Sequence, residues 1–282
     1  MTQLRSVLAV QPGQPASDGA GVRLTRVIGG GGLERFDPFL MLDEFGSDNP
    51  DDYIAGFPPH PHRGFETITY MLEGRMRHED HLGNVGLLQS GGVQWMTAAH
   101  GVIHSEMPEQ QEGVMRGFQL WLNLPAKDKL GAPGYRDFSP WEIPRLQRAD
   151  GVEVVVIAGR FDDGQHQQDG AVQRQHTEPQ LFDLRLPAAS AIAPRLPQGH
   201  RLMLYVYEGE LEVNGHKVGK SRLVRLADDG ELQLSSMAGA KVLLIAGKPL
   251  GEPIVQYGPF VMNSHEEIEQ ALRDYRDGVL AA

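Results

Sequence analysis

Hydrophobic residues along this chain fall in short alternating or β-branched runs, separated by turns rich in glycine and proline. In the first half, the runs at 65–72, 93–97 and 117–124 predict strands, because alternation with a period of two places one face of each in a core. A second series of runs covers residues 152–158, 181–186, 202–207, 210–213, 223–226, 232–235 and 241–246. Many short strands joined by tight turns predict a sandwich or barrel.

One segment near the end of the chain instead has the spacing of a helix. Its apolar positions recur every three or four residues, at Ile268, Ala271, Leu272 and Tyr275. Asn263 or Ser264 can cap its start, and Gly278 marks its end. We therefore expect one amphipathic C-terminal helix that packs on a barrel.

The length of 282 residues is enough for two domains. Residues 125–144 lack strand periodicity and are rich in Lys, Pro, Gly and Asp, which predicts a linker. The sequence YMLEG at 70–74 is echoed by YVYEG at 205–209, which favours duplication of one barrel. We therefore expect two mostly β domains, 1–135 and 136–282, with the C-terminal helix in the second.

Charge and composition exclude some ligands and some kinds of metal site. The formal net charge of −11 is the opposite of the basic footprint that binding to a nucleic-acid backbone requires. Because the chain has no cysteine, disulfides, thiolate zinc sites and iron–sulfur clusters are excluded. Any metal must therefore be held by His, Asp or Glu.

Two further features concern location and phosphate binding. No apolar run approaches the roughly 18 residues of a membrane span, and the start, MTQLRSVLAV, lacks a signal-peptide core. We expect a cytoplasmic protein that has no contact with membranes. The glycines at 29–32 lack the Lys-Ser/Thr of a phosphate loop, so a turn is expected there.

Histidines cluster in two short segments, PPHPH at 58–62 and HGVIHSE at 100–106. In an extended chain, residues i and i+2 point to the same side, so His60 and His62 can aim at one point. The same parity holds for His104 and Glu106. Two segments can thus deliver three imidazole nitrogens and one carboxylate oxygen to one centre.

This donor set suits Fe, Mn, Ni, Cu or Zn and leaves one or two coordination positions open. A structural zinc site would normally be closed and rich in sulfur, which fits poorly. Taken alone, His-x-His is common, and a hydrogen-bonded loop pair is the alternative interpretation. The His-x-Glu segment favours the metal.

Several segments now resemble one family, the pirins, which are bicupins. They are GFPPHPHRGFET at 56–67, DPFLMLDEF at 37–45, QWMTA at 94–98, HSEMP at 104–108, QLWLNL at 119–124 and YGPFVMN at 257–263. The similarity runs from about residue 20 to residue 277, in the same order. It implies two jelly-roll barrels. The second has no His-x-His, and near its YVYEG segment only His200 and His216 occur, so we expect it to bind no metal.

The resemblance also implies ligands and an activity. The metal, usually iron as Fe(II), would be held by His60, His62, His104 and Glu106, while Glu66 would support the site without binding the ion. The implied activity is that of a quercetin 2,3-dioxygenase, which opens the ring of a flavonol or similar small aromatic with O2 and releases carbon monoxide. Glu106 would then act as a general base.

Other roles stay open at this point. Pirins also act as non-catalytic, redox-responsive regulators that dock on a transcription factor or metabolic enzyme. His100 could reach the metal, carry a proton or cap a turn. His78 and His81 are expected in a solvated turn, although His78 matches the pirin pattern and could line the cavity wall.

Overall fold

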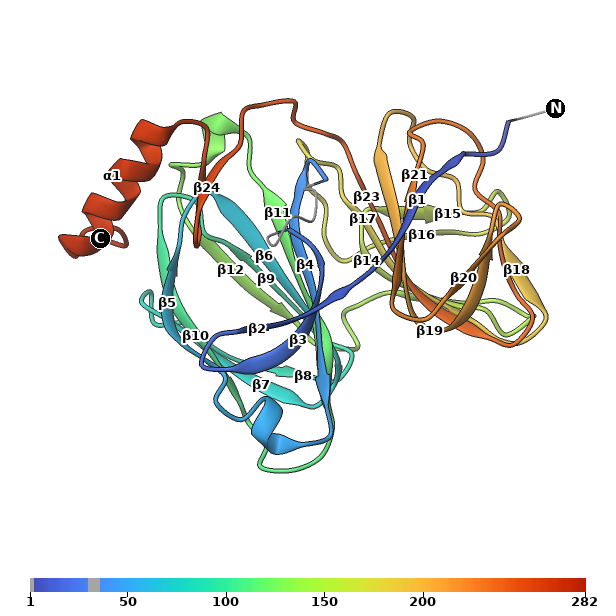
Figure 1. Ribbon diagram of the computed structural model, residues 1–282, viewed down its shortest axis with the longest axis horizontal. Helices are drawn as coiled ribbons and strands as arrows, with labels where there is room; N and C mark the ends of the chain where they lie inside the picture. The colour runs from blue at the N-terminus through green and yellow to red at the C-terminus, as the bar shows by residue number, and fades with distance from the viewer. Residues whose placement is uncertain (1–2, 30–35) are drawn as a thin grey trace. The chain divides into compact units, whose positions relative to one another are not determined.

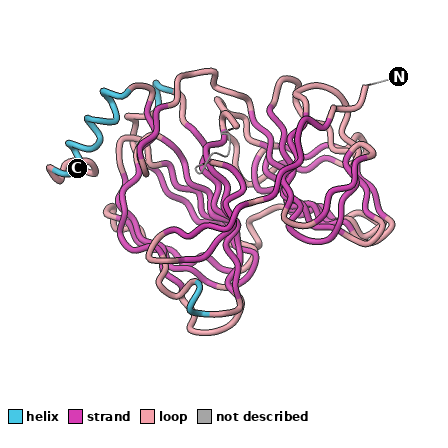
Figure 2. Tube along the Cα trace, in the orientation of Figure 1, coloured by secondary structure: helices cyan, strands magenta, loops and turns pink. Residues whose placement is uncertain are grey.

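The computed structural model describes residues 3–29 and 36–282, and strands make up most of it (Figures 1 and 2). Every run predicted as a strand lies within or overlaps an observed one. The expected turn at 29–32 lies largely outside the described residues. The residues divide into two compact units, a larger one of 14–141 and 250–282 and a smaller one of 1–13 and 142–249.

The larger unit contains two large antiparallel sheets, besides a two-stranded one near the end of the chain. The seven-stranded sheet has the order β12-β9-β6-β11-β4-β3-β2 and the four-stranded sheet the order β5-β10-β7-β8. The strands of the first are β2 (Gln14–Asp18), β3 (Val22–Ile28), β4 (Phe39–Ser47), β6 (Phe65–Glu73), β9 (Val93–Thr97), β11 (Met115–Asn123) and β12 (Gly134–Phe138). Those of the second are β5 (Phe57–His62), β7 (Arg75–Asp80), β8 (Val85–Gln89) and β10 (Val102–Pro108).

The two sheets of the larger unit face each other. Thr69 on β6 donates a hydrogen bond to Glu106 on β10, and the ring of Trp121 on β11 lies 5.3 Å from that of His62 on β5. Strand β6 is buried over seven successive residues, as expected for a strand whose two faces are both covered. The space between the sheets is therefore lined by side chains from both.

The smaller unit is built around one ten-stranded sheet, whose main path is β1-β21-β19-β23-β17-β14-β13. Its strands are β1 (Val7–Pro12), β13 (Arg145–Gln147), β14 (Glu153–Ala158), β17 (Gln180–Leu186), β18 (Ser190–Ile192), β19 (Arg201–Val213), β20 (His216–Gly219), β21 (Arg222–Leu226), β22 (Leu234–Ser236) and β23 (Ala240–Gly247). A separate hairpin pairs β15 (Arg160–Asp162) with β16 (Gln167–Asp169). Alternate residues of these strands form one large apolar core.

The division into units differs from the expected cut between residues 135 and 136. Strand β1 pairs antiparallel with β21 and therefore belongs to the smaller unit. Residues 250–282 belong to the larger unit, with β24 (Val255–Tyr257), β25 (Phe260–Met262) and the helix α1 (His265–Arg276). The N-terminal strand β1 thus joins the smaller unit, although the residues that follow it form the larger one. The C-terminal segment joins the larger unit, although the residues before it form the smaller one.

The expected linker at 125–144 also needs correction. It contains a short 3-10 helix, Ala126–Asp128, and the strand β12. This strand pairs with β9 and forms one edge of the seven-stranded sheet. Another 3-10 helix covers Pro50–Asp52. No helix in the described ranges is long and apolar enough to cross a membrane, and the cytoplasmic location stays a prediction.

The helix α1 begins as predicted, because Ser264 caps it through a hydrogen bond from the Glu267 backbone N–H. Its Asp274 forms an ion pair of 2.6 Å with Arg63, the residue after His62. Lys129, which is 1% exposed, donates from Nζ to the carbonyl oxygens of Gly64 and Val261 and to the side chain of Asn123. These contacts tie the C-terminal segment to the end of β5.

Gly64 provides a test of this close contact. Its φ of +91° suits glycine, and a Cβ there would lie 2.0 Å from the carbonyl oxygen of Val261. Gly83 has a similar φ of +83° but open space around it. We expect Gly83→Ala to cost about 1 kcal/mol, from strain alone, and Gly64→Ala about 2–4 kcal/mol, from strain and overpacking. Urea unfolding of both variants measures the difference, and equal losses would contradict this packing.

Candidate metal centre

The candidate site starts from the pairing of β5 with β10. The two strands are antiparallel, with His60 directly opposite His104 and His62 opposite Val102. Strand β5 carries three prolines and lies at the edge of its sheet, where a residue without an N–H is tolerated. The extended backbone that the prolines favour puts His60 and His62 on the same side, as the sequence parity predicted.

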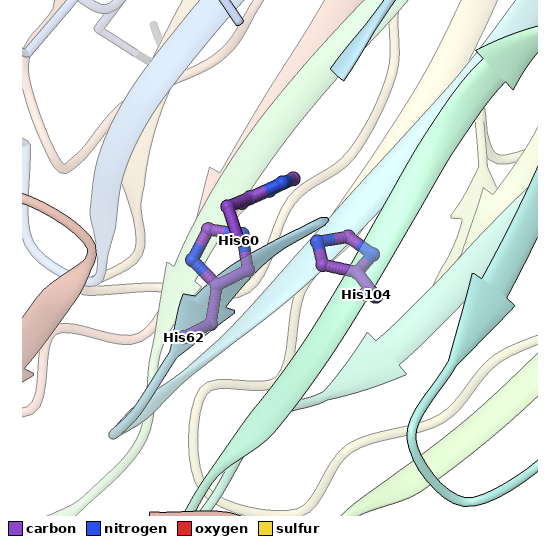
Figure 3. Close-up of side chains that lie close together, drawn as sticks. All are labelled: His60, His62 and His104. Carbon is purple, nitrogen blue, oxygen red and sulfur yellow. The ribbon is translucent and has the colours of Figure 1, made fainter. Parts of the chain in front are cut away.

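The three histidine rings meet at one place (Figure 3). Ring centroids lie 4.7 Å apart for His60 and His62, 4.4 Å for His60 and His104, and 4.9 Å for His62 and His104. One nitrogen from each ring lies within 4.8 Å of the others, a spacing that could hold a metal ion. Neutral imidazoles are ligands for Fe, Ni, Cu and Zn.

Each ring has one nitrogen engaged by the protein. His60 Nδ1 lies 2.8 Å from the carbonyl oxygen of Pro58, which can only accept, so its Nε2 carries the lone pair. His62 makes a hydrogen bond with the backbone of Pro259, and its buried Nδ1 has no partner among the described residues. The same is true of the buried Nε2 of His104. His60 and His62 thus each present a nitrogen lone pair, and the third unpartnered nitrogen belongs to His104, whose tautomer depends on its contact with His78.

Burial keeps these rings neutral. Desolvation lowers the pKa of His60, and it lowers the pKa of His62 and of His104 well below the usual range, with the neighbouring rings adding to the shift. A cationic imidazolium cannot bind a metal. The site is therefore ready for a cation at neutral pH.

Glu106, the fourth expected ligand, lies near this group but outside it. Among the described residues, the group of mutually close ligand atoms contains the three histidines and not this carboxylate. Glu106 is 4% exposed, lines the same cavity, and accepts a hydrogen bond of 3.1 Å from Thr69. Burial raises its pKa to about 7, against the lowering effect of Thr69.

The other residues that the sequence singled out have separate places. Glu66 on β6 is buried and accepts a hydrogen bond of 2.6 Å from Thr97, away from the histidine group. His100 lies beside the carbonyl oxygen of Gly131, in the turn-capping role that was one of its alternatives. His78 is not in a solvated turn, because it is fully buried and its Nδ1 lies 3.3 Å from His104.

A cavity of about 650 Å³ opens from the histidine group within the larger unit. Its walls are mainly apolar, from Leu24, Leu40, Met41, Phe45, Phe57, Met76 and Trp121. Sequence reasoning missed its charged part, where Arg26 forms two hydrogen bonds with the buried Asp43 and one with Asp18. These three residues are far apart in sequence and carry no motif, so only strand pairing brings them together.

Comparison with known proteins agrees with the fold. Residues 21–122 match the family Pirin, and residues 181–281 match the family described as Pirin C-terminal cupin domain. The two cupin domains expected from the resemblance are therefore confirmed.

Individual relatives cover nearly the whole chain. It is 72% identical to "Putative quercetin 2,3-dioxygenase" of Pseudomonas aeruginosa, over 100% of both chains, and 40% identical to "Pirin" of Rattus norvegicus, over 93% of this chain and 88% of that one. A crystal structure of quercetin 2,3-dioxygenase from Acinetobacter baumannii superimposes with a TM-score of 0.91 at 30% identity, covering 99% of each chain. The chain belongs to the pirin family.

Proposed function

We propose that this protein is an iron-dependent dioxygenase that opens the ring of a flavonol, or of a similar small aromatic, with O2. The observation that carries the proposal is the convergence of three neutral imidazoles, two of which, His60 and His62, line a largely apolar cavity. The relatives named as quercetin 2,3-dioxygenases support the choice of reaction.

The proposed ligands are His60, His62 and His104, with Glu106 as the fourth. A nitrogen- and oxygen-donor set of this kind suits Fe(II), and Mn, Ni, Cu or Zn are chemically compatible alternatives. When bound, the ion would act as a Lewis acid and template for a substrate oxygen. Glu106 follows His104 by two residues on β10, and it would need only to turn toward the imidazoles to complete the set.

The cavity fits a small aromatic substrate. Its volume lies within the roughly 300–1,000 Å³ typical of sites for such ligands. Apolar side chains cover most of its wall and exclude water from a flat ring system. Arg26 and Asp43 supply a donor and an acceptor for phenolic hydroxyls at the same wall.

Glu106 is also the proposed general base. Thr69 holds its Oε1, which leaves Oε2 to take a proton from a substrate hydroxyl. With no metal bound, its pKa of about 7 makes it a more effective base at neutral pH than a carboxylate with an ordinary pKa. Because a bound cation would lower that pKa, Glu106 would act as the base only after turning away from the ion. Burial of the site thus prepares the proton acceptor as well as the ligands.

The first prediction concerns metal content. Wild-type protein should bind one divalent ion, and His62→Ala should weaken binding at least about 100-fold, because loss of a ligand exceeds the cost of losing a supporting contact. His216→Ala changes an exposed histidine of the smaller unit and should bind as wild type does. Competition with a chromophoric chelator measures all three. Equal affinities would contradict the site.

The second prediction tests Glu106 as a ligand. In the metal-free protein its pKa near 7 makes it mostly protonated at pH 6 and ionised at pH 8.5. Binding of Zn2+ should therefore release about one more proton from wild type than from Glu106→Gln at pH 6, and about the same number at pH 8.5. Calorimetry in buffers of different ionisation enthalpy counts the protons. No difference at pH 6 would remove Glu106 from the ligand set.

The third prediction concerns turnover. Iron-loaded protein should consume quercetin and O2 and release carbon monoxide, with kcat/KM reduced at least about tenfold in His62→Ala and unchanged in His216→Ala. Flavonol absorbance and an oxygen electrode follow the reaction. Turnover that survives in His62→Ala would contradict metal catalysis. Wild-type protein that leaves a panel of phenolic substrates intact would favour the redox-responsive regulator instead.

A further inference from the structure

A chain of buried polar groups lies behind His104, on the side away from the cavity. His104 Nδ1 is 3.3 Å from His78 Nδ1, and His78 Nε2 is 3.5 Å from Asp80 Oδ2. His104 and His78 are 1% and 0% exposed, and the side chain of Asp80 is 1% exposed. The pairing of β7 with β10 sets these positions, with Asp80 opposite His104 and His78 opposite Glu106.

The two facing nitrogens must share one hydrogen. Both rings are almost completely buried, where a charged imidazolium is costly, so each ring is neutral and carries a single N–H. Two arrangements are then possible. Either His104 donates from Nδ1 and its Nε2 has the lone pair, or His78 donates and His104 carries its hydrogen on Nε2, where it blocks a metal.

Asp80 decides between the two arrangements. Its Oδ1 accepts hydrogen bonds from the backbone N–H groups of Leu82 and Asn84, and its Oδ2 accepts one from Asn84 Nδ2. The carboxylate is thus held in place by its own turn and can only accept. Its negative charge, 3.5 Å from His78 Nε2, favours a hydrogen on that nitrogen, although the two atoms do not form a hydrogen bond of normal geometry. A hydrogen there leaves a lone pair on His78 Nδ1 for the hydrogen of His104.

The ring of His78 is also held in its plane. It stacks on Tyr135, with ring centroids 4.5 Å apart and an interplanar angle of 21°. The Tyr135 hydroxyl donates to Asp137 at 2.5 Å, and Gln94 donates to both residues. His78 therefore cannot rotate without breaking this packing.

We infer that Asp80 and His78 are positioning residues that select the tautomer of His104, so that its Nε2 lone pair faces the other two imidazoles before any metal binds. A carboxylate commonly orients a metal-binding histidine directly. Here the carboxylate acts through a second histidine. The inference rests on the proposed metal site and is independent of the ring-opening activity.

The test reads the tautomer in the metal-free protein, by NMR of 15N-labelled histidine rings at pH 7.5. Wild-type His104 should be the Nδ1–H form. In Asp80→Asn, the amide N–H can face His78 Nε2, while a flip of the Asn84 amide keeps the turn bonded. Donation to His78 Nε2 moves the hydrogen of His78 to Nδ1 and should shift His104 toward the Nε2–H form.

Metal affinity is the second readout. Asp80→Asn should bind Zn2+ about 10- to 100-fold more weakly than wild type, as expected when a supporting contact to a ligand is lost. Glu79→Gln changes the exposed neighbour on β7 and should leave both the tautomer and the affinity unchanged. If Asp80→Asn does not fold, His78→Phe keeps a ring against Tyr135 and removes the acceptor, and it should yield mixed tautomers of His104.

Two results would overturn the inference: the Nε2–H form of His104 in wild type, or the Nδ1–H form retained without change in Asp80→Asn. In the second case, a loss of affinity would show a merely structural role for Asp80. Absence of flavonol turnover would count against the proposed function alone, because the tautomer is read without metal or substrate.

Discussion

The antiparallel pairing of β5 with β10 is the interaction on which the candidate metal centre depends. It sets His60 opposite His104, and the extended backbone of β5 adds His62 on the same side. A slip of one residue along either strand would turn its histidines to the opposite face. The contacts of Arg63 and Lys129 with the C-terminal segment hold the end of β5, so the register is supported from residues far away in sequence.

Burial has a consistent effect on the chemistry of this region. It holds the imidazoles in their neutral form and raises the pKa of Glu106 toward neutrality. Both changes follow from the cost of placing a charge away from water. A cation entering the site would offset that cost, because it provides the opposite charge to Glu106 and partners for three lone pairs. The same apolar surroundings that disfavour an uncompensated charge also suit an aromatic ligand.

Much of the fold could be predicted from the sequence. Alternating runs located the longer strands, such as β6 and β17, and the spacing of apolar residues with a Ser cap located α1. Strand β12 was missed because its sequence, GYRDF, has little apolar alternation and follows a proline-rich stretch. The grouping of the chain ends depends on pairing between residues more than 200 positions apart, and local patterns do not record such pairing.

The candidate site was also predictable only where it depends on local sequence. Residue parity predicted that His60 and His62 share one side of their strand, and that His104 and Glu106 share one side of theirs, because it depends only on local extended backbone. The meeting of the two segments depends on the pairing of β5 with β10. Parity could not reveal that His78 lies behind His104, or that Arg26 meets Asp43, since both contacts require the register between neighbouring strands. A His-x-Asp pair on the strand next to the His-x-Glu segment was the available signal for the first of these.

The most direct measurement of the central claim is a crystal structure of the protein loaded with Zn2+, with anomalous data collected at the zinc edge. We predict one strong peak about 2.0–2.1 Å from a nitrogen of each of His60, His62 and His104, with at least one coordination position open to the cavity. A peak bound elsewhere, or these three rings turned away from a common ion, would contradict the account.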